Sequence, residues 1–421
     1  MILNNYFIDY HVKGYLSRGP LVVLLDGFCQ WLETMRFSRG TIRLHISQVS
    51  VFSDFLGQIS LADYTELSQE HFELFFDDYL PNSTNKRGNP FNSKAISWSI
   101  NRFKQYFHTK GLSENLKDKD APYKKLLDEY LNWLENYKGL SPGTIKIRKQ
   151  YLSFFLEWFY KSIESKELSA LSPTQVTDYF IDFGATRGPS ARRSMQATLR
   201  TFFCFCTQKG YITHNLDQAV PTMRTYKLSH TPRGIVDKEA QRLLNDIDRG
   251  TKSGCRNYAM IQMLYSYGVR GGQVRALRLQ DINWLKNQIR FPGLKGGKDS
   301  LLPIIDPVGE SLLDYLQNVR PNMPFKEVFL TLRAPYKALQ KSSVLSESIR
   351  TLIRRHKIKS PSGGSHLFRH SFAIRMLKRG HSIKSIADIF GHKHIQTTFI
   401  YTKVDFKTLE KVALDWLETE R

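Results

Sequence analysis

The sequence predicts a mainly α-helical protein, with two similar helical domains followed by an α-rich domain that holds a small antiparallel sheet. Amphipathic patterns with helical spacing fill much of the 421 residues. Landmarks in the first half recur after about one small domain's length. In the second half, two short strand patterns at 288–291 and 300–304 flank a glycine-rich turn, which is typical of a hairpin.

Four landmarks recur in the same order along the first half, 99 to 103 residues apart. They are a Trp-Leu-Glu triplet, a Ser-x-Gly-Thr-Ile run, an aromatic helix end followed by Lys-Gly, and an Asn-Leu pair. A fixed period of this length indicates a duplicated domain. The paired residues are Trp31 and Trp133, Ser38 and Ser141, Lys110 and Lys209, and Asn115 and Asn215.

We therefore divide the chain into copy one (residues 1–118), copy two (119–220), a linker (221–234) and a third domain (235–421). The linker is basic and contains proline and serine residues, as loops do. In each copy a serine precedes an amphipathic helix, so Ser38 and Ser141 are expected N-caps. Helices of the third domain are expected at 237–248, 256–267, 346–356, 366–379, 383–390 and 406–418.

The composition indicates a partner with many negative charges. The formal net charge is +22 and the sequence pI is about 9.7, which favours nucleic acid, although a solvated basic surface is the alternative. Four scattered cysteines do not suggest a disulfide framework, and we expect Cys204 and Cys206 to pack in a core. No secretory signal or membrane-length apolar run is recognised. The protein is thus expected in the cytoplasm, associated with DNA and not with a membrane.

Basic and polar side chains at helix starts are candidates for phosphate contacts. Two arginines near one helix N-terminus are well placed for phosphate, because the amide groups there are also free to bind it. An ordinary solvated helix face has the same composition and remains the alternative. The candidates are Arg39 and Arg43 in copy one, and Thr144, Lys146, Lys149, Arg192 and Arg193 in copy two.

Six residues of the third domain suit the cleavage of a phosphodiester. On a helix His366 and Arg369 share one face, and Arg270 follows a glycine at which the chain can turn. Two guanidiniums can stabilise the charge of a pentacoordinate phosphate, and Lys295 in its glycine-rich turn can protonate a leaving oxygen. Tyr401 is a suitable nucleophile, whose proton His366 or a backbone group can accept, and His392 completes the set.

The order and spacing of these residues resemble the catalytic domain of the tyrosine recombinases, the family of phage integrases, Xer recombinases and Cre-like enzymes. Two departures occur: Gln273 stands where the family has an acidic residue, and Lys298 is a second lysine in the hairpin turn. The matching segments are Tyr-Gly-Val-Arg at 267–270, Leu-Lys-Gly-Gly-Lys at 294–298, His-Leu-Phe-Arg-His-Ser-Phe-Ala at 366–373, Phe-Gly-His at 390–392 and Thr-Phe-Ile-Tyr at 398–401.

The resemblance implies that copy two is a SAM-like core-binding domain and that copy one is an addition. It implies a 3′-phosphotyrosyl intermediate, a Holliday junction, and neither cofactor nor metal. The expected partners are double-stranded DNA recombination sites, a homo-oligomer that is tetrameric in the synapse, and accessory or sister recombinases. The extra domain favours an integrase or transposase of a mobile element. The alternatives are a housekeeping Xer-type resolvase, a type IB topoisomerase, and a DNA-binding protein with an inactive site.

Overall fold

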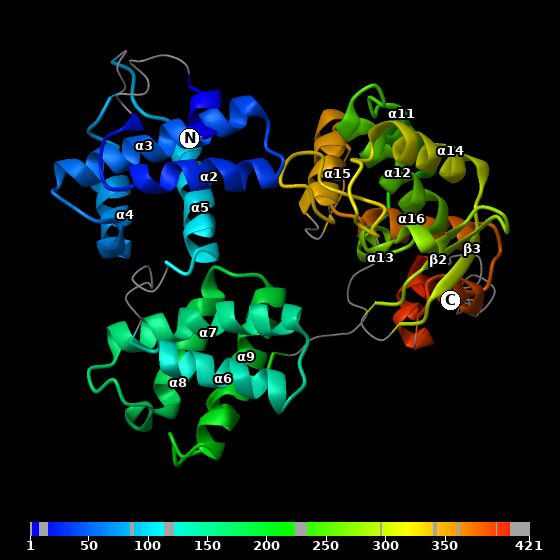
Figure 1. Cartoon of the computed structure of the whole chain (residues 1–421). Coiled ribbons are helices and arrows are strands. Elements are labelled where there is room, and N and C mark those ends of the chain that lie inside the picture. Colours follow the sequence, from blue (N-terminus) through cyan, green and yellow to red (C-terminus); the bar gives the residue numbers. More distant parts are fainter. Residues whose placement is uncertain are drawn as a thin grey trace. The chain divides into compact units, whose positions relative to one another are not determined.

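The computed structural model describes residues 2–7, 16–84, 88–112, 122–223, 234–294, 297–339, 343–358, 360, 363–392 and 394–404. These residues are mainly helical, with one three-stranded antiparallel sheet (Figure 1). The predicted fold class is thereby confirmed. None of the described helices is long and apolar enough to cross a membrane.

Contacts divide the chain into two compact units. One unit contains residues 1–9, 24–46 and 228–421, and the other contains 10–23 and 47–227. This division distributes the helices of copy one over both units. The domain boundaries expected at 118 and at 221–234 therefore stay a prediction.

Copy one begins with a 3-10 turn and continues with four α-helices among its described residues. The Ser38 Oγ accepts from the Thr41 N–H at 3.4 Å, and the Asn92 side chain accepts from the Ala95 N–H at 3.2 Å, so each satisfies an amide that a helix start leaves unpaired. The elements are the 3-10 turn Ile2–Asn5, α2 (Val22–Thr34), α3 (Arg39–Gln58), the 3-10 turn Tyr64–Glu66, α4 (Gln69–Leu74), the π turn Phe75–Tyr79 and α5 (Ser93–Thr109).

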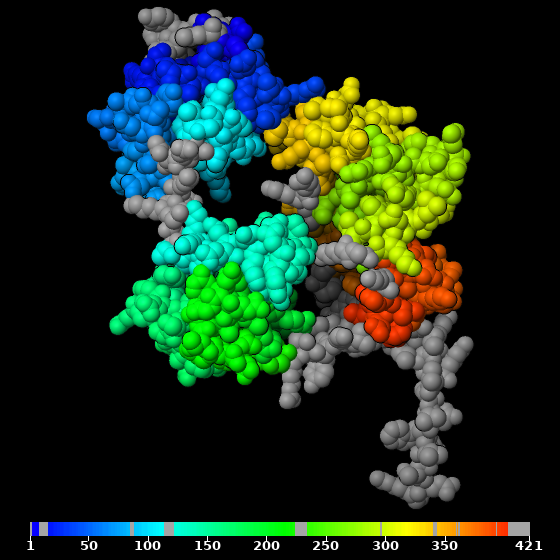
Figure 2. Space-filling view, turned by 60° about the horizontal axis from the view of Figure 1, so that its bottom comes forward, coloured from blue at the N-terminus to red at the C-terminus, as the bar shows by residue number. Residues whose placement is uncertain are grey.

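Copy two is built around an aromatic core. Phe155 lies at its centre, with its ring 5.6 Å from Phe203 and 5.1 Å from Tyr179. Residues 122–223 form a continuous packed body, cyan to green in Figure 2. The elements are α6 (Lys124–Asn136), α7 (Pro142–Ser162), the 3-10 turn Leu168–Ala170, α8 (Pro173–Ala185), α9 (Pro189–Gln208) and α10 (Leu216–Ala219), with α7 packed on α6 and α9.

The two copies agree in local geometry as well as in element order. Trp31 stacks on Phe28 with ring centroids 6.1 Å apart, and Trp133 stacks on Tyr130 at 6.2 Å, both with interplanar angles of 22°. Ser141 caps α7 through the Thr144 N–H at 3.4 Å, the same distance as in copy one. These agreements support the predicted duplication.

In the third domain, one large hydrophobic core surrounds the buried helix α12, which contacts α14 and α16 (Figure 1). Antiparallel strands β1, β2 and β3 follow in that order, with Ile289 of β2 opposite Leu302 of β3. The elements are α11 (Asp237–Asn245), α12 (Lys252–Tyr267), α13 (Gly271–Ala276), β1 (Ile282–Asn283), β2 (Gln288–Phe291), β3 (Ser300–Pro303), α14 (Asp306–Asp314), the π turn Tyr315–Val319, α15 (Ser343–Arg355), α16 (His366–Lys378), α17 (Ile383–Ile389), and the 3-10 turns Ile395–Thr397 and Phe399–Val404.

Three elements and one side chain differ from the expectations. The short β1 and α13, and also α14, were not predicted. Cys206 is buried as expected, but Cys204 is exposed, so its assignment to the core is wrong. Leu199, Phe202, Phe203 and Cys206 occupy the buried face of α9, and Cys204 lies outside that face. The helix expected at 406–418 lies outside the described residues.

Candidate active site

Five of the six predicted catalytic residues lie among the described residues, and all five belong to the same compact unit. Arg270 is placed by the end of α12. Gly268 ends that helix with φ 62°, and a Cβ there would lie 2.7 Å from the Phe372 ring, so the backbone of α12 closely approaches α16. The turn puts Arg270 at the N-cap of α13. Lys295 lies outside the described residues.

Gln273 links this turn to the hairpin. Its side-chain oxygen accepts from the Arg270 N–H at 3.0 Å, and its Nε2 donates to the Pro292 carbonyl at 3.0 Å. The side chain is almost completely buried. An amide can make both bonds because it carries a donor and an acceptor, whereas an ionised carboxylate only accepts.

The hairpin base is fixed by charged side chains. Arg290 of β2 bonds Asp281 on one side and Asp299 on the other, the latter at 3.3 Å. Asp299 in turn accepts from the Gly293 N–H at 2.7 Å. The ends of the turn that carries Lys295 are thus held, and Lys298 is exposed at its far end.

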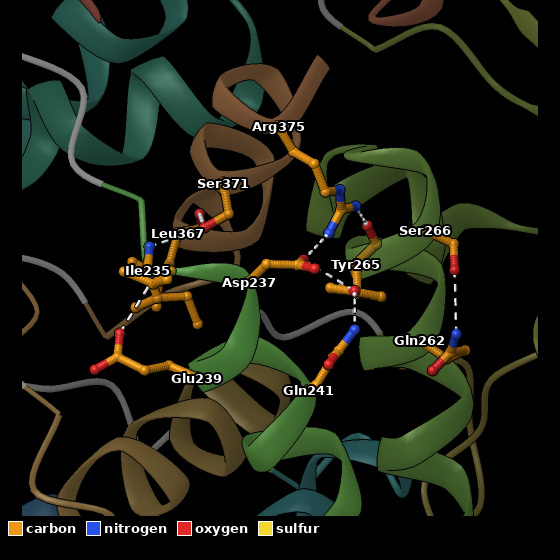
Figure 3. Close-up of polar contacts among 11 residues, drawn as sticks. Ile235, Asp237, Glu239, Gln241, Gln262, Tyr265, Ser266, Leu367, Ser371 and Arg375 are labelled. Carbon is orange, nitrogen blue, oxygen red and sulfur yellow. Dashed lines mark hydrogen bonds and ion pairs between the residues drawn. The ribbon is translucent and has the colours of Figure 1, made fainter. Parts of the chain in front are cut away.

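Helix α16 carries His366, Arg369 and His370, and it is anchored on the side shown in Figure 3. The Ile235 N–H donates to Ser371 Oγ at 2.8 Å, and Arg375 pairs with Asp237 of α11 at 2.6 Å. Arg375 also donates to the Tyr265 carbonyl of α12 at 2.5 Å. Polar contacts from three segments therefore set the position of the helix.

Arg369 is 4% exposed and is surrounded by backbone acceptors. Its Nη1 donates to the Gly268 carbonyl at 2.9 Å and its Nη2 to the Phe390 carbonyl at 3.3 Å, with the guanidinium carbon 3.6 Å from the Phe390 ring centroid. Burial, together with the charge of Arg270, lowers its pKa to about 9. The group therefore remains a cation at neutral pH.

The Phe390 carbonyl also accepts from Arg270, whose Nη1 lies 3.5 Å away. Two guanidiniums that are 99 residues apart in sequence thus converge on one oxygen at the end of α17. Ser300 of β3 donates to the neighbouring Ile389 carbonyl at 3.1 Å, which joins the sheet to the same turn. An arrangement that presents two guanidiniums to one oxygen can also present them to a phosphate oxygen.

The tautomer of His392 follows from its partners. Its Nε2 lies 2.8 Å from Arg369 Nη2, and because a guanidinium only donates, Nε2 must be the acceptor. The proton is therefore on Nδ1, which donates to Thr398 Oγ1 at 2.6 Å. Burial, and then the charges of Arg369 and Arg270, lower the pKa of His392 to about 4, so the ring is neutral at physiological pH.

Tyr401 is 3% exposed and lies in a second, smaller core with Phe372, Phe390 and Ile386. Its N–H donates to the Thr398 carbonyl at 3.0 Å, and its hydroxyl is 3.0 Å from His370 Nδ1. Burial raises the pKa of Tyr401 to about 12, against the opposing effect of Arg369 and Arg270. The phenol is thus protonated at neutral pH.

A cleft of about 830 Å³ opens beside these residues. His366 is exposed and lines it together with Arg270 and His392. Among the described residues, those lining the cleft do not include Arg369 or Tyr401, which lie deeper. The polar lining includes Arg270, Arg275, Ser365, His366, His392 and His394.

The sequence reasoning gave no role to three residues that contact the predicted ones, His370, Phe390 and Thr398. His370 directly follows Arg369 and falls on the same helix face as His366, which was a usable signal. The bond from Arg369 to the Phe390 carbonyl has no such signal, because a carbonyl is a backbone group.

The candidate DNA contacts differ in how free their side chains are. Lys146, Lys149 and Arg193 of copy two are exposed, whereas Arg192 is half-buried and donates through Nε to the Arg187 carbonyl at 2.8 Å. The Thr144 hydroxyl is already hydrogen-bonded to Ser141, the N-cap of α7. In copy one, Arg39 donates to the Asn5 carbonyl at 2.7 Å, and Arg43 lies 5.6 Å from the Phe7 ring.

Residues 234–408 match the phage integrase family. The Sinorhizobium fredii protein y4rA, which carries an integrase/recombinase name, is 31% identical over 401 residues, covering 94% of this chain and 95% of that protein. Tyrosine recombinase XerD of Listeria innocua is 27% identical over 292 residues, covering 68% of this chain and 96% of XerD. A XerH site-specific recombinase bound to palindromic difH has a similar fold, with a TM-score of 0.54 at 20% identity over 76% of this chain and 95% of that one.

Proposed function

This chain belongs to the phage integrase family, the tyrosine recombinases, and we propose that Tyr401 is the nucleophile with which it cuts and rejoins DNA. The enzyme transfers DNA strands through a 3′-phosphotyrosyl intermediate and a Holliday junction. The observation that carries the residue assignment is the convergence of Arg270 and Arg369 on the Phe390 carbonyl, within residues 234–408 that match the family. His392 is bonded to Arg369, and the Phe390 ring lies 6.2 Å from the Tyr401 ring.

In the first step the Tyr401 Oη attacks the scissile phosphorus, and the bond from phosphorus to the 5′ oxygen breaks. Arg270 and Arg369 bind the nonbridging oxygens and stabilise the negative charge that grows on them. Their positions favour this role, because both guanidiniums already point to one shared acceptor. Rejoining reverses the step with a 5′-hydroxyl from the partner duplex, so the energy of the phosphoester is kept throughout.

The leaving 5′ oxygen requires a proton, which we assign to Lys295 of the hairpin turn. The fixed hairpin base supports this assignment, because the turn is held beside the cleft by Gln273 and Asp299. Lys298 is the alternative donor. A 5′-bridging sulfur leaves without a proton and should restore cleavage in Lys295→Ala; restoration in Lys298→Ala alone would transfer the role to Lys298.

An integrase or transposase of a mobile element is favoured over a housekeeping resolvase. The XerD relative covers 68% of this chain, whereas y4rA covers 94% and so includes most of copy one. Four protomers on two double-stranded sites are proposed to form the synapse, with accessory or sister recombinases as further partners. The C-terminal helix at 406–418 is proposed to dock on a neighbouring protomer.

A nicked suicide substrate tests the nucleophile. The wild type should form a covalent protein–DNA adduct, and Tyr401→Phe should bind the same DNA with unchanged affinity but form no adduct. An adduct with the Phe variant would refute the assignment of Tyr401. Relaxation of a supercoiled plasmid without a recombination site would instead favour the type IB topoisomerase alternative.

A further inference from the structure

The hydroxyl of Tyr401 contacts His370, a residue to which the family resemblance assigned no role. The distance from Tyr401 Oη to His370 Nδ1 is 3.0 Å, and the two rings meet at 59° with centroids 5.6 Å apart. His370 comes from α16 and Tyr401 from the turn Phe399–Val404, 31 residues later. The contact therefore joins two separate elements of the site.

The other two histidines of the site are placed for different tasks. Both ring nitrogens of His392 are occupied, Nε2 by Arg369 and Nδ1–H by Thr398, so its lone pair is not offered to the phenol. His366 is exposed and lines the cleft with Arg270, where a phosphate would lie. His370 lies one helical turn below His366, on the side of Tyr401.

The surroundings of His370 keep it able to accept a proton. Burial, and then the charges of His366 and Arg369, hold the pKa of His370 below its ordinary value of 6.5. The charged groups that act on the pair are His366 and Arg369 of α16 and, on the Tyr401 side, Arg270 at the start of α13. The imidazole is therefore neutral at neutral pH, and with its proton on Nε2 the Nδ1 lone pair faces the phenol.

We propose that His370 is the general base of the reaction, a step that rests on the proposed role of Tyr401. As Oη attacks phosphorus, the Oη–H bond breaks and an Nδ1–H bond forms, while the O–P bond to Tyr401 forms and the P–O5′ bond breaks. The 5′ oxygen takes its proton from the hairpin lysine. In rejoining, the imidazolium returns its proton to the departing Tyr401 oxygen, so His370 acts there as general acid.

The proton moves during the attack and not before it. Tyr401 has a pKa of about 12 and His370 one below 6.5, so a complete prior transfer is strongly unfavourable. As the Tyr401 oxygen bonds to phosphorus, its O–H group becomes much more acidic. The proton then moves to Nδ1 of His370. Cleavage should therefore require neutral His370.

Single-turnover adduct formation on a suicide substrate with a 5′-bridging sulfur tests this, because that substrate removes the leaving-group proton from the pH profile. For the wild type, the rate should fall about tenfold per pH unit below the pKa of His370. His370→Gln keeps a hydrogen-bonding side chain but cannot take the proton. It should lower the rate by about 100-fold or more, remove the acid limb, and leave DNA affinity unchanged.

Matched variants separate this role from folding and from the nucleophile. His366→Gln should keep the acid limb, and the exposed His381→Gln should match the wild type. His370→Ala should recover adduct formation on addition of imidazole, and rejoining should slow by the same factor as cleavage. A wild-type profile in His370→Gln, or an acid limb that disappears in His366→Gln instead, would overturn the proposal. An adduct in Tyr401→Phe would instead overturn the proposed function.

Discussion

In copy two, Arg148 of α7 is half-buried and donates to Thr198 Oγ1 of α9 at 3.1 Å. His45 is the matching residue of copy one, since it follows Thr41 by four positions as Arg148 follows Thr144. It is fully buried, and its ring lies 5.3 Å from the Phe37 ring. Ser99, the counterpart of Thr198, donates to Gln48. The N-caps and the stacked tryptophans are the same in both copies, whereas the buried polar positions carry different residue types.

The charges of the two copies also differ. Residues 1–118 contain twelve acidic and twelve basic side chains, whereas residues 119–220 have a net charge of +4 and residues 221–421 one of +18. Five of the acidic residues of copy one lie within residues 66–78, namely Glu66, Glu70, Glu73, Asp77 and Asp78. The comparison teaches that the N-caps and the stacked tryptophans were retained, while the buried polar pairs and the surface charges changed. We therefore expect copy two to contribute more than copy one to phosphate binding.

Charge reversal gives the largest expected difference between the copies. Lys146→Glu with Lys149→Glu should weaken DNA binding about 100-fold and reduce the slope of log K against log salt by about 2, since two phosphate contacts are lost. The copy-one pair Arg39→Glu with Arg43→Glu should weaken binding only severalfold. Fluorescence anisotropy across a salt series measures both, and equal losses would contradict the unequal roles.

Removal of copy one is the next test. A chain that starts at residue 119 should form the Tyr401 adduct on a core substrate at a rate close to that of the full chain. Its footprint should be shorter or its synapsis weaker by at least about tenfold, because contacts from one module raise the effective concentration of the next. Gel-shift and footprinting assays report this. Loss of core cleavage would place copy one within the clamp around the core site.

The exchanged polar groups should differ in their contribution to stability. Arg148→Met should lower the free energy of unfolding by about 1.5 kcal/mol, because a charge-assisted bond is lost while the apolar stem is replaced. Ser99→Ala should cost about 1 kcal/mol, as it removes a neutral bond to Gln48. Urea unfolding of each variant measures this, and an equal or reversed order would contradict the comparison.

The caps provide the smallest and most symmetric test. Ser38→Ala and Ser141→Ala should each cost about 1 kcal/mol, because each leaves a threonine N–H without its acceptor. The serine-to-glycine variants should cost only a few tenths of that. Amide exchange in the first turns of α3 and α7 resolves the two sites separately. Unequal effects would mean that the agreement of the caps is only local.

The active-site residues were predictable because their chemistry restricts their type and spacing. Arg270, His366, Arg369, His392 and Tyr401 each carry a functional group that few residues can replace, and four of them fall within 36 residues. Their actual partners were not predictable. The Phe390 carbonyl is common to every residue type, and its contact with Arg270 spans 120 residues. The bonds of Gln273 likewise required the hairpin to be in place.

The Phe390 carbonyl has a consequence for selectivity. A phosphate that binds Arg270 and Arg369 replaces this internal acceptor, and every phosphodiester of a duplex presents the same nonbridging oxygens for the exchange. The existing contacts are long, at 3.5 and 3.3 Å, so the exchange also costs little. The reaction centre is then nearly indifferent to which phosphodiester enters. Discrimination between one site and the rest of a genome must therefore come from the surfaces that hold the duplex, and not from the chemistry.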